Sequence, residues 1–245
     1  MIVGSEFDGV TAAILAGGLG TRLRAVVADR PKVLAPVGGR PFLTYLLDRL
    51  ARAGVRETVL LVGYGADRVR AAVGGEYAGM RLIFSEEREP LGTGGALRLA
   101  LPLFGPGACL VLNGDSYCDV DLAAFSRFQH ERPATPALVV AAVDDASRYG
   151  RVRLDAASRV ECFEEKTGVS TPGTINAGVY LFPRDCIASI PAGRPHSLER
   201  DCLPTWLGQT GLRGYPGGKF IDIGTPESYA TTEAFFRTTG SGATS

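Results

Sequence analysis

Apolar runs of strand length alternate with helix-spaced segments through the first half of the chain. The run over 10–15 leads into a glycine-rich stretch, and residues 41–53 show helical spacing that starts with a proline and stops at Gly54. The pattern continues with predicted strands at 57–64, 81–87 and 108–115 and predicted helices at 66–73 and 94–101. Strands that alternate with helices form βαβ units, so we predict an α/β fold with a Rossmann-like, doubly wound, mostly parallel sheet.

The pattern changes at about residue 137. Closely spaced strand candidates follow, with the sequences ALVVAAVDD, GRVRLDA, RVECFEEK and TINAGVYLFP. They predict antiparallel strands that add a second lobe to the sheet. A last helix is expected over about 226–237, started by Thr225 as N-cap, a proline and an acidic residue. We therefore expect one domain over 1–239, with halves at about 10–136 and 137–239, and a disordered tail at 240–245.

Composition and charge favour a small-molecule partner. The chain has 26 basic and 26 acidic residues, so neither a nucleic-acid-binding surface nor a membrane-binding basic patch is indicated. The longest apolar run, Ala137 to Val143, is far shorter than the roughly 18 residues of a membrane span. No secretory signal is visible, and five cysteines without a CxxC pair fit reduced thiols in a cytoplasm. The sequence leaves open whether the chain is a monomer or a homodimer.

The glycines after the first predicted strand are placed to bind an anion. Gly17, Gly18 and Gly20 lie at the carboxyl end of that strand, where backbone N–H groups can close on a phosphate, although a tight turn is the plainer interpretation. The third glycine of the dinucleotide fingerprint is missing and no GK[ST] follows. Arg22 and Lys32 add two cations within a short stretch, and Lys32 is one of only three lysines against 23 arginines. A compact ammonium suits a crowded phosphate oxygen, so this spacing favours a triphosphate site.

The segments AGGLGTRL and PKVLAPVGGRPF resemble the sugar-1-phosphate nucleotidylyltransferases. The resemblance continues in order through EPLGTGGAL, LNGD, FEEK, INAGVYLF and FIDIGTPE and covers nearly the whole chain. Within that family the chain is most similar to the D-glycero-D-manno-heptose 1-phosphate guanylyltransferases, from which it departs at Ala25, Val33 and Leu34. The resemblance implies transfer of a nucleoside monophosphate from GTP, or another NTP, to a sugar 1-phosphate for polysaccharide biosynthesis. The first half would bind the nucleotide and the second the sugar phosphate.

The family resemblance also implies Mg²⁺ as cofactor. Asp115 closes the fourth predicted strand and Asp222 lies in FIDIG; both supply the oxygen ligands that Mg²⁺ takes together with substrate phosphates, although either could cap a turn. With Arg22 and Lys32 they form the expected catalytic set. The expected nucleotide-binding residues are Leu15, Ala16, Gly17, Gly18, Gly20, Thr21, Glu87, Gly92, Thr93 and Asn113. A helix cap is the plainer interpretation of Thr93, and Gly94 and Gly95 would then let a base lie against backbone.

Glu87 is the candidate reader of the base. Uridylyl-transferring relatives commonly have an amide at this position, which offers both a donor and an acceptor to uracil. A carboxylate only accepts, which matches the N1–H and N2–H₂ donors of guanine. Each mispaired buried group costs about 1 to 3 kcal/mol, so Glu87 favours GTP over UTP.

The second half contains the residues that the resemblance assigns to the sugar phosphate. These are Tyr149, Gly150, Glu165, Lys166, Asn176, Gly178 and Lys219, the last expected to add charge near the metal. Glu199 could contact the sugar or lie on an exposed helix face. Neither histidine lies in a motif, and no base is needed because the attacking phosphate has its second pKa near about 6. Mannose or N-acetylmuramic acid 1-phosphate as acceptor, UTP as donor, and a non-catalytic sugar-nucleotide sensor stay open as alternatives.

Overall fold

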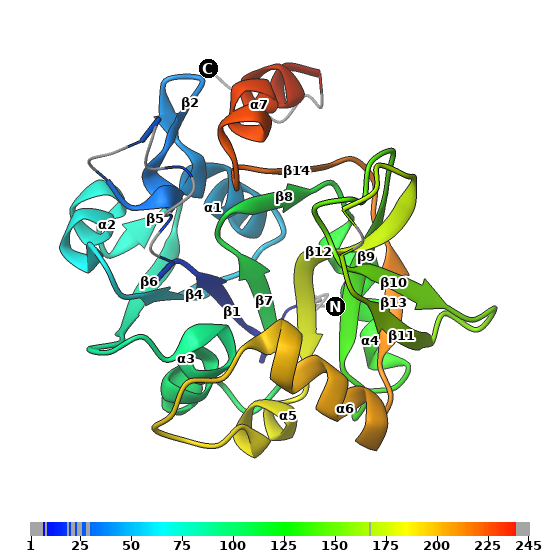
Figure 1. Cartoon of the computed structure of the whole chain (residues 1–245). Helices are drawn as coiled ribbons and strands as arrows, with labels where there is room; N and C mark the ends of the chain where they lie inside the picture. The colour runs from blue at the N-terminus through cyan, green and yellow to red at the C-terminus, as the bar shows by residue number, and fades with distance from the viewer. Residues whose placement is uncertain are drawn as a thin grey trace, which may run out of the picture.

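A mixed sheet of ten strands runs through the computed structural model, which describes residues 7, 9–18, 20, 23, 26–27, 30–166 and 168–238 (Figure 1). One part of the sheet is parallel, in the order β7, β1, β4, β6, with the short β5 antiparallel at its edge. The bounds are β1 Thr11–Leu15, β4 Glu57–Val62, β5 Glu76–Tyr77, β6 Met80–Glu86 and β7 Cys109–Asn113. The predicted α/β fold with a mostly parallel first half is confirmed.

The second half adds antiparallel strands next to β7. The long strand β12 pairs with β9 along one edge, and its other edge pairs with β7 and, through Ile175, with β10. β10 pairs in turn with β11, and β13 lies parallel to β9. The bounds are β9 Ala137–Val143, β10 Arg151–Leu154, β11 Val160–Glu164, β12 Gly173–Phe182 and β13 Arg213–Pro216. β12 therefore joins both halves in one sheet, as the closely spaced apolar segments predicted.

Helices cover both faces of the sheet and bury two apolar cores. Alternate residues of β1 show the division, because Ala12 and Ile14 belong to one core and Ala13 to the other. The first core includes apolar side chains of α1 (Phe42–Arg52), α2 (Ala66–Val73), α4 (Leu122–His130) and α7 (Pro226–Thr238). The second includes those of α3 (Gly92–Ala100), α5 (Arg184–Ser189) and α6 (Leu203–Gln209). The strands β7, β1, β4 and β6 run parallel, so their carboxyl ends lie at the same edge of the sheet.

A small ladder outside the main sheet brings two distant segments together. β8 (Ser116–Cys118) follows β7 directly, and it pairs antiparallel with β14 (Phe220–Asp222), so that Asp222 lies opposite Ser116. The N–H of Ile223 also donates to the carbonyl oxygen of Asp115 over 2.9 Å. The buried guanidinium of Arg49, on α1, donates to the carbonyl oxygens of Cys118, at the end of β8, and of Val120. The ladder places the two predicted metal carboxylates side by side.

Several short elements have no periodic signal in the sequence. They are β2 (Pro36–Val37), β3 (Arg40–Pro41), 3₁₀ turns at Lys32–Leu34 and Leu101–Leu103, and a π-helical turn at Leu198–Cys202 that leads into α6. The predicted start of the last helix is confirmed, since the N–H of Ser228 donates to Thr225 Oγ1 over 3.3 Å. None of the described helices is long and apolar enough to cross a membrane. The tail predicted at 240–245 lies outside the described residues.

Candidate active site

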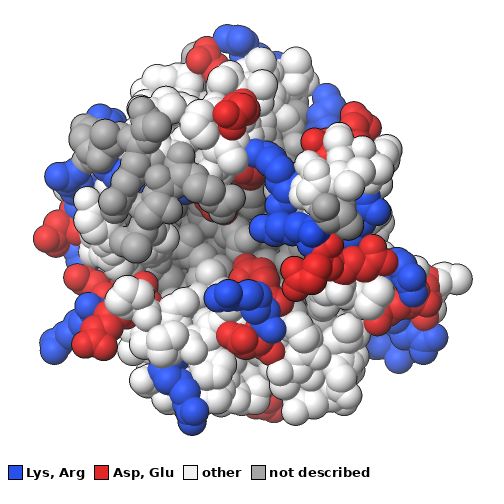
Figure 2. Space-filling view, viewed as in Figure 1, with Lys and Arg blue, Asp and Glu red and all other residues white. Residues whose placement is uncertain are grey.

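A pocket of about 320 Å³ opens at the carboxyl ends of the parallel strands. β4 and then β6 lie on one side of β1, and β7 lies on its other side. The strand order therefore reverses between β1 and β7, and open α/β sheets bind ligands at such a point. Leu15 and Asn113 are paired across β1 and β7 at that point. The pocket is lined by Leu15, Gly17, Gly18, Lys32, Val33, Leu61, Glu87, Pro90, Gly92, Thr93, Ala96, Asn113, Gly114, Asp115 and Glu199. Figure 2 shows the hollow in the middle of this face, with basic and acidic side chains along its rim.

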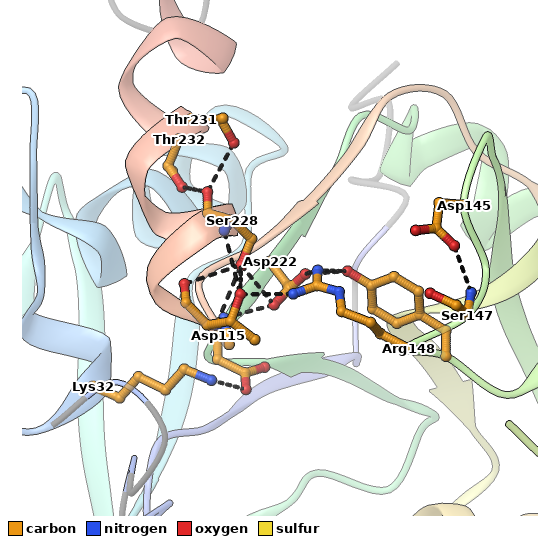
Figure 3. Close-up of polar contacts among 12 residues, drawn as sticks. Lys32, Asp115, Asp145, Ser147, Arg148, Asp222, Ser228, Thr231 and Thr232 are labelled. Carbon is orange, nitrogen blue, oxygen red and sulfur yellow. Dashed lines mark hydrogen bonds and ion pairs between the residues drawn. The ribbon is translucent and has the colours of Figure 1, made fainter. Parts of the chain in front are cut away.

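Lys32 and Asp115 form an ion pair at one end of the pocket. Lys32 Nζ lies 2.7 Å from Asp115 Oδ2, and the lysine side chain is 12% exposed whereas that of Asp115 is 45% exposed (Figure 3). The stem of Lys32 packs against Gly20, where an added Cβ would lie 3.0 Å from Lys32 Cβ. Close packing of the stem leaves the ammonium directed at the carboxylate. The end of the pocket that holds this pair is suited to bind phosphate oxygens together with a cation.

Glu87 forms the floor of the pocket at the end of β6. Its Oε2 accepts a hydrogen bond from the N–H of Leu91 over 2.9 Å, and its Oε1 lies under Gly17 and Gly63, where an added Cβ would come within 3.1 and 2.9 Å of that oxygen. Burial raises the pKa of this carboxyl, and the bond from Leu91 opposes part of that rise. One carboxylate oxygen is thus held by the backbone, and the pocket wall presents the other.

The glycine turn at the start of α3 packs against protein. The N–H groups of Gly94 and Gly95 both donate to the carbonyl oxygen of His196, over 2.9 and 3.2 Å. A Cβ on Gly94 would lie 2.7 Å from Cys202 Sγ. These two glycines therefore admit the segment before the π-helical turn, and our expectation that a base would lie against them is wrong.

Thr93 connects the same two segments and does not cap α3. Its hydroxyl accepts from the N–H of Leu198 over 2.7 Å and donates to Glu199 Oε2 over 3.0 Å, while the helix starts one residue earlier, at Gly92. The plainer interpretation of Thr93, as a cap, is thus wrong. Glu199 is exposed on the π-helical turn and also lines the pocket. Its contact with the sugar stays a prediction. π-Helical turns often mark functional sites.

Asp222 is held by four groups of the protein. Its Oδ2 accepts from Arg148 Nη2 over 2.9 Å and from the hydroxyl of Tyr149, and its Oδ1 accepts from the N–H of Gly224 over 2.6 Å and from Ser228 over 3.3 Å (Figure 3). A Cβ on Gly224 would lie 3.7 Å from Lys32 Nζ, so Lys32 lies near both aspartates. Burial and Asp222 raise the pKa of Tyr149 well above its usual value.

The donor set around the two aspartates fits a magnesium ion. Within the described residues, no group of three or more His, Cys, Asp or Glu side chains is arranged to hold a metal. Two adjacent carboxylates nevertheless suit Mg²⁺, because that ion takes one or two protein carboxylates and completes its shell with water and substrate phosphates. In the structure each carboxylate carries a cation instead, Lys32 on Asp115 and Arg148 on Asp222.

Four of the seven residues predicted to bind the sugar phosphate lie at one end of the β10–β11 hairpin. Arg151 is paired with Glu164, so Tyr149 and Gly150 before β10 lie next to Glu165 and Lys166 after β11. A Cβ on Gly150 would lie 3.1 Å from the carbonyl oxygen of Glu164. Both Glu165 and Lys166 are exposed. This end of the hairpin reaches the two aspartates through the hydroxyl of Tyr149 on Asp222.

Asn176 and Gly178 lie on the irregular part of β12, beside the nucleotide strand β7. Asn176 donates to the hydroxyl of Tyr180 over 3.0 Å and accepts from the N–H of Gly178 over 3.0 Å, so both ends of its amide contact protein. Gly178 has a positive φ of 73°, and a Cβ there would lie 2.7 Å from Asn113 Nδ2. Only glycine allows this strand to approach Asn113 so closely. Both ends of the Asn176 amide thus have protein partners, and its contact with the sugar stays a prediction.

Four other predicted residues are Lys219, Ala16, Thr21 and Arg22. Lys219 is exposed directly before β14, and its carbonyl oxygen accepts from the N–H of Asp119; the charge it is expected to add near the metal stays a prediction. Ala16 is buried beneath the glycines, with its N–H donated to Leu61. Thr21 and Arg22 lie outside the described residues.

Sequence reasoning missed two polar residues that contact Asp222, Ser228 and Arg148. Arg148 lies 74 residues before Asp222 and belongs to no spacing pattern. Its position directly before Tyr149 and Gly150, both expected to bind substrate, was the one available signal. The apolar residues Val33, Leu61, Pro90 and Ala96, which line the pocket, were also missed.

Comparison with known proteins identifies the class. The model of the nucleotidyl transferase family matches residues 11–239, so the chain belongs to the nucleotidyl transferase family. In sequence it is 34% identical over 218 residues to D-glycero-alpha-D-manno-heptose 1-phosphate guanylyltransferase of Campylobacter jejuni, covering 89% of this chain and 96% of that protein. It is 37% identical over 229 residues to mannose-1-phosphate guanylyltransferase of Mycobacterium tuberculosis, covering 92% of this chain but only 64% of that longer protein.

A solved structure shows the same fold at similar identity. HddC from Yersinia pseudotuberculosis, crystallised in complex with GMP-PN, superposes with a TM-score of 0.80 at 35% identity, covering 92% of this chain and 99% of that one. The predicted family and fold class are thus confirmed.

Proposed function

We propose that the protein transfers GMP from GTP to a sugar 1-phosphate, with D-glycero-α-D-manno-heptose 1-phosphate as the first candidate acceptor. The observation that carries this proposal is the distribution of charge in the pocket. An acceptor-only carboxylate, Glu87, forms one wall, and a lysine with an aspartate, Lys32 and Asp115, forms another. Guanine offers two adjacent donors and a triphosphate offers anionic oxygens, so GTP is complementary to both.

The nucleotide site would use the backbone as well as these side chains. Glu87 Oε2 is already engaged by Leu91, so Oε1 would accept from N1–H or N2–H₂ of guanine. Gly17 and Gly18 would offer N–H groups at the carboxyl end of β1, and Lys32 would bind phosphate oxygens. Arg22 would join them. The names of the guanylyltransferase relatives and the GMP-PN complex of HddC support the same choice of base.

The proposed chemistry is an in-line displacement at the α-phosphorus. A phosphate oxygen of the sugar 1-phosphate forms a bond to that phosphorus, and the bond from it to the β-bridging oxygen breaks. The electron pair leaves with pyrophosphate, and the GDP-sugar remains. Because the attacking phosphate is mostly dianionic at neutral pH, no side chain needs to remove a proton. The chain's task is then to align the two anions and neutralise their charge.

Asp115 and Asp222 would hold Mg²⁺, which would supply positive charge that neutralises the phosphates. The remaining charge falls to the protein's own cations. Lys32 would neutralise the triphosphate and Lys166 the incoming phosphate. Tyr149, Gly150 and Glu165 would position the sugar at the end of the hairpin.

Two acceptors have separate support. This chain covers 96% of the length of the heptose 1-phosphate guanylyltransferase of C. jejuni, so nearly all of that protein has a counterpart here. The mannose-specific relative of M. tuberculosis is slightly more identical, at 37%, but this chain spans 64% of it. We therefore place heptose first and mannose second.

Pyrophosphate release tests the proposal directly. Purified protein with Mg²⁺ is given each of four NTPs against a panel of heptose, mannose, glucose and N-acetylmuramic acid 1-phosphates. We expect turnover with GTP and heptose 1-phosphate to exceed all other pairs. A preference for UTP would overturn the guanylyl assignment, faster turnover of mannose 1-phosphate would overturn the choice of heptose, and absence of turnover with every pair would overturn the transferase proposal.

A further inference from the structure

Arg148 connects the hairpin of the second half to the segment that carries Asp222. It lies in the turn between β9 and β10, where the N–H of Tyr149 donates to the carbonyl oxygen of Ala146 and the N–H of Ser147 to Asp145 Oδ1. From this turn its guanidinium donates to Asp222 Oδ2 over 2.9 Å and to Thr225 Oγ1 over 2.7 Å (Figure 3). It also donates to the hydroxyl of Tyr149 over 2.7 Å. The arginine side chain is 41% exposed, so it has room to move.

The contacts of Asp222 leave a metal ion only one route to this carboxylate. Oδ1 is held by the Gly224 N–H and by Ser228, groups fixed at the start of α7. Oδ2 is held by two side-chain groups, the guanidinium of Arg148 and the hydroxyl of Tyr149. A cation that binds Oδ2 must therefore displace Arg148, because two cations cannot share that oxygen without strong repulsion.

The displaced guanidinium stays beside the expected acceptor site. Arg148 is covalently next to Tyr149 and Gly150, and the register of β10 with β11 places Glu165 and Lys166 at the same end of the hairpin. A guanidinium binds phosphate through two parallel hydrogen bonds, a geometry that an ammonium cannot supply. Lys166 and a released Arg148 would together neutralise the dianionic phosphate of the acceptor.

We propose that Arg148 is an exchangeable cation: it neutralises Asp222 until a divalent metal takes that carboxylate, and it then binds the phosphate of the sugar 1-phosphate. The second step rests on the proposed function, whereas the first concerns only this chain and a metal ion. The device links the two substrates, because arrival of the metal with the nucleotide frees a ligand for the acceptor.

Binding of Mn²⁺ alone, followed by electron paramagnetic resonance, tests the first step without any turnover. Two variants are compared with wild type: Arg148→Gln, which can still donate to Thr225, and Arg148→Ala, which cannot. We expect both variants to bind Mn²⁺ about fivefold more tightly than wild type, because the metal no longer has to break the ion pair between Arg148 and Asp222. The factor is small because a partly exposed ion pair is weak. Arg153→Ala is the control, since Arg153 is a more exposed arginine on β10 that pairs with Glu161 and Glu164 away from Asp222.

Steady-state kinetics with GTP and the preferred acceptor test the second step. We expect both variants to raise the KM for the sugar 1-phosphate by about tenfold or more while the KM for GTP stays within about twofold. Arg148→Lys, which keeps the charge but not the fork, is expected to fall between wild type and Arg148→Gln.

Three results separate the possible failures. Unchanged or weaker Mn²⁺ binding in both variants would overturn the exchange, since Arg148 would then merely orient Asp222. Tighter Mn²⁺ binding with an unchanged KM for the sugar 1-phosphate would overturn the handover to the acceptor. If wild type releases no pyrophosphate from any substrate pair, the proposed function fails, and the Mn²⁺ comparison still decides whether Arg148 competes with a metal.

Discussion

The two halves of the molecule build their parts of the site in different ways. In the parallel half, Gly17, Glu87 and Asp115 each lie one or two residues after a strand, β1, β6 and β7, so the strand ends gather them. In the antiparallel half, Tyr149 and Asp222 lie on a turn and on a two-stranded ladder and meet only through a hydrogen bond. The parallel half thus presents a preformed pocket, whereas the other half contributes Asp222, held by an ion pair with Arg148 and a hydrogen bond from Tyr149.

This difference indicates a division of labour. Groups fixed by strand ends suit recognition of a rigid base, which needs constant geometry. Groups held by exchangeable ion pairs suit phosphates and metals, whose arrival changes the charge at the site. Asp115 and Asp222 lie where the two halves meet, and each is paired with a cation, Lys32 from the first half and Arg148 from the second.

The largest effect is expected where the halves share the metal. Asp115→Asn and Asp222→Asn each remove one charge from the expected Mg²⁺ site, and we expect kcat to fall at least about a hundredfold in both, as pyrophosphate release would show. EDTA should abolish turnover of wild type. Asp67→Asn, on the exposed first turn of α2, serves as control. An Asp222→Asn variant within about threefold of wild type would contradict the two-aspartate site.

Lys32→Arg sharpens the comparison from the preformed side. The lysine stem packs on Gly20 and its ammonium reaches Asp115 in a nearly buried position, so a planar fork cannot take the same place. We expect kcat/KM for the nucleotide to fall about thirtyfold although the charge is kept. Thermal melting checks that the variant is folded. Near-normal kcat/KM in a folded variant would show that any cation serves at this position.

The sequence predicted the parallel half well because its site depends on order along the chain. Each apolar run ends at the same edge of the sheet, so a polar residue after a run could be placed at the pocket without knowing any side-chain contact. Glu87 follows β6 and Asn113 ends β7; the resemblance assigns both to the nucleotide site, and both line the pocket. The start of α7 at Thr225 was likewise a local signal.

The second half was predicted less completely because its contacts are non-local. The bond from Arg148 to Asp222 depends on how the β9–β10 turn packs on the β8–β14 ladder, and three-residue strands leave no periodic pattern. Thr93 resembled a helix cap because threonine is common there, but packing of the π-helical turn gave its hydroxyl other partners. Lys219, which the resemblance assigns to the sugar-phosphate site, is exposed directly before β14, and its role stays a prediction.

Base choice tests whether the preformed half acts alone. We expect wild type to prefer GTP over UTP by at least about tenfold in kcat/KM, and Glu87→Gln to lower that ratio by about tenfold. The amide oxygen would keep the bond from Leu91, which turns the amide NH₂ toward the guanine donors. The same NH₂ would gain a uracil carbonyl as partner. Glu89→Gln, two residues further and exposed, is the control, and an unchanged ratio in Glu87→Gln would show that this residue does not contact the base.

The smallest expected effect is on stability, and it again concerns Glu87. Burial raises the pKa of its carboxyl in the folded chain above the value in the unfolded chain. The folded state therefore retains a proton that the unfolded state has lost, so this group's contribution to stability is present at low pH and declines as pH rises through the folded pKa. Glutamine cannot ionise, so the Glu87→Gln variant does not lose this contribution.

We therefore expect the melting temperature of Glu87→Gln minus that of wild type to increase as pH rises from about 4 to 7. The increase should be no more than about 2 °C because the side chain is only partly buried. Differential scanning fluorimetry across this range measures the gain. For Glu89→Gln the difference in melting temperature from wild type should not change with pH, because the carboxylate of Glu89 is exposed to solvent in both the folded and the unfolded chain. A difference for Glu87→Gln that decreases as pH rises would show that the folded protein holds the Glu87 carboxylate in its charged form.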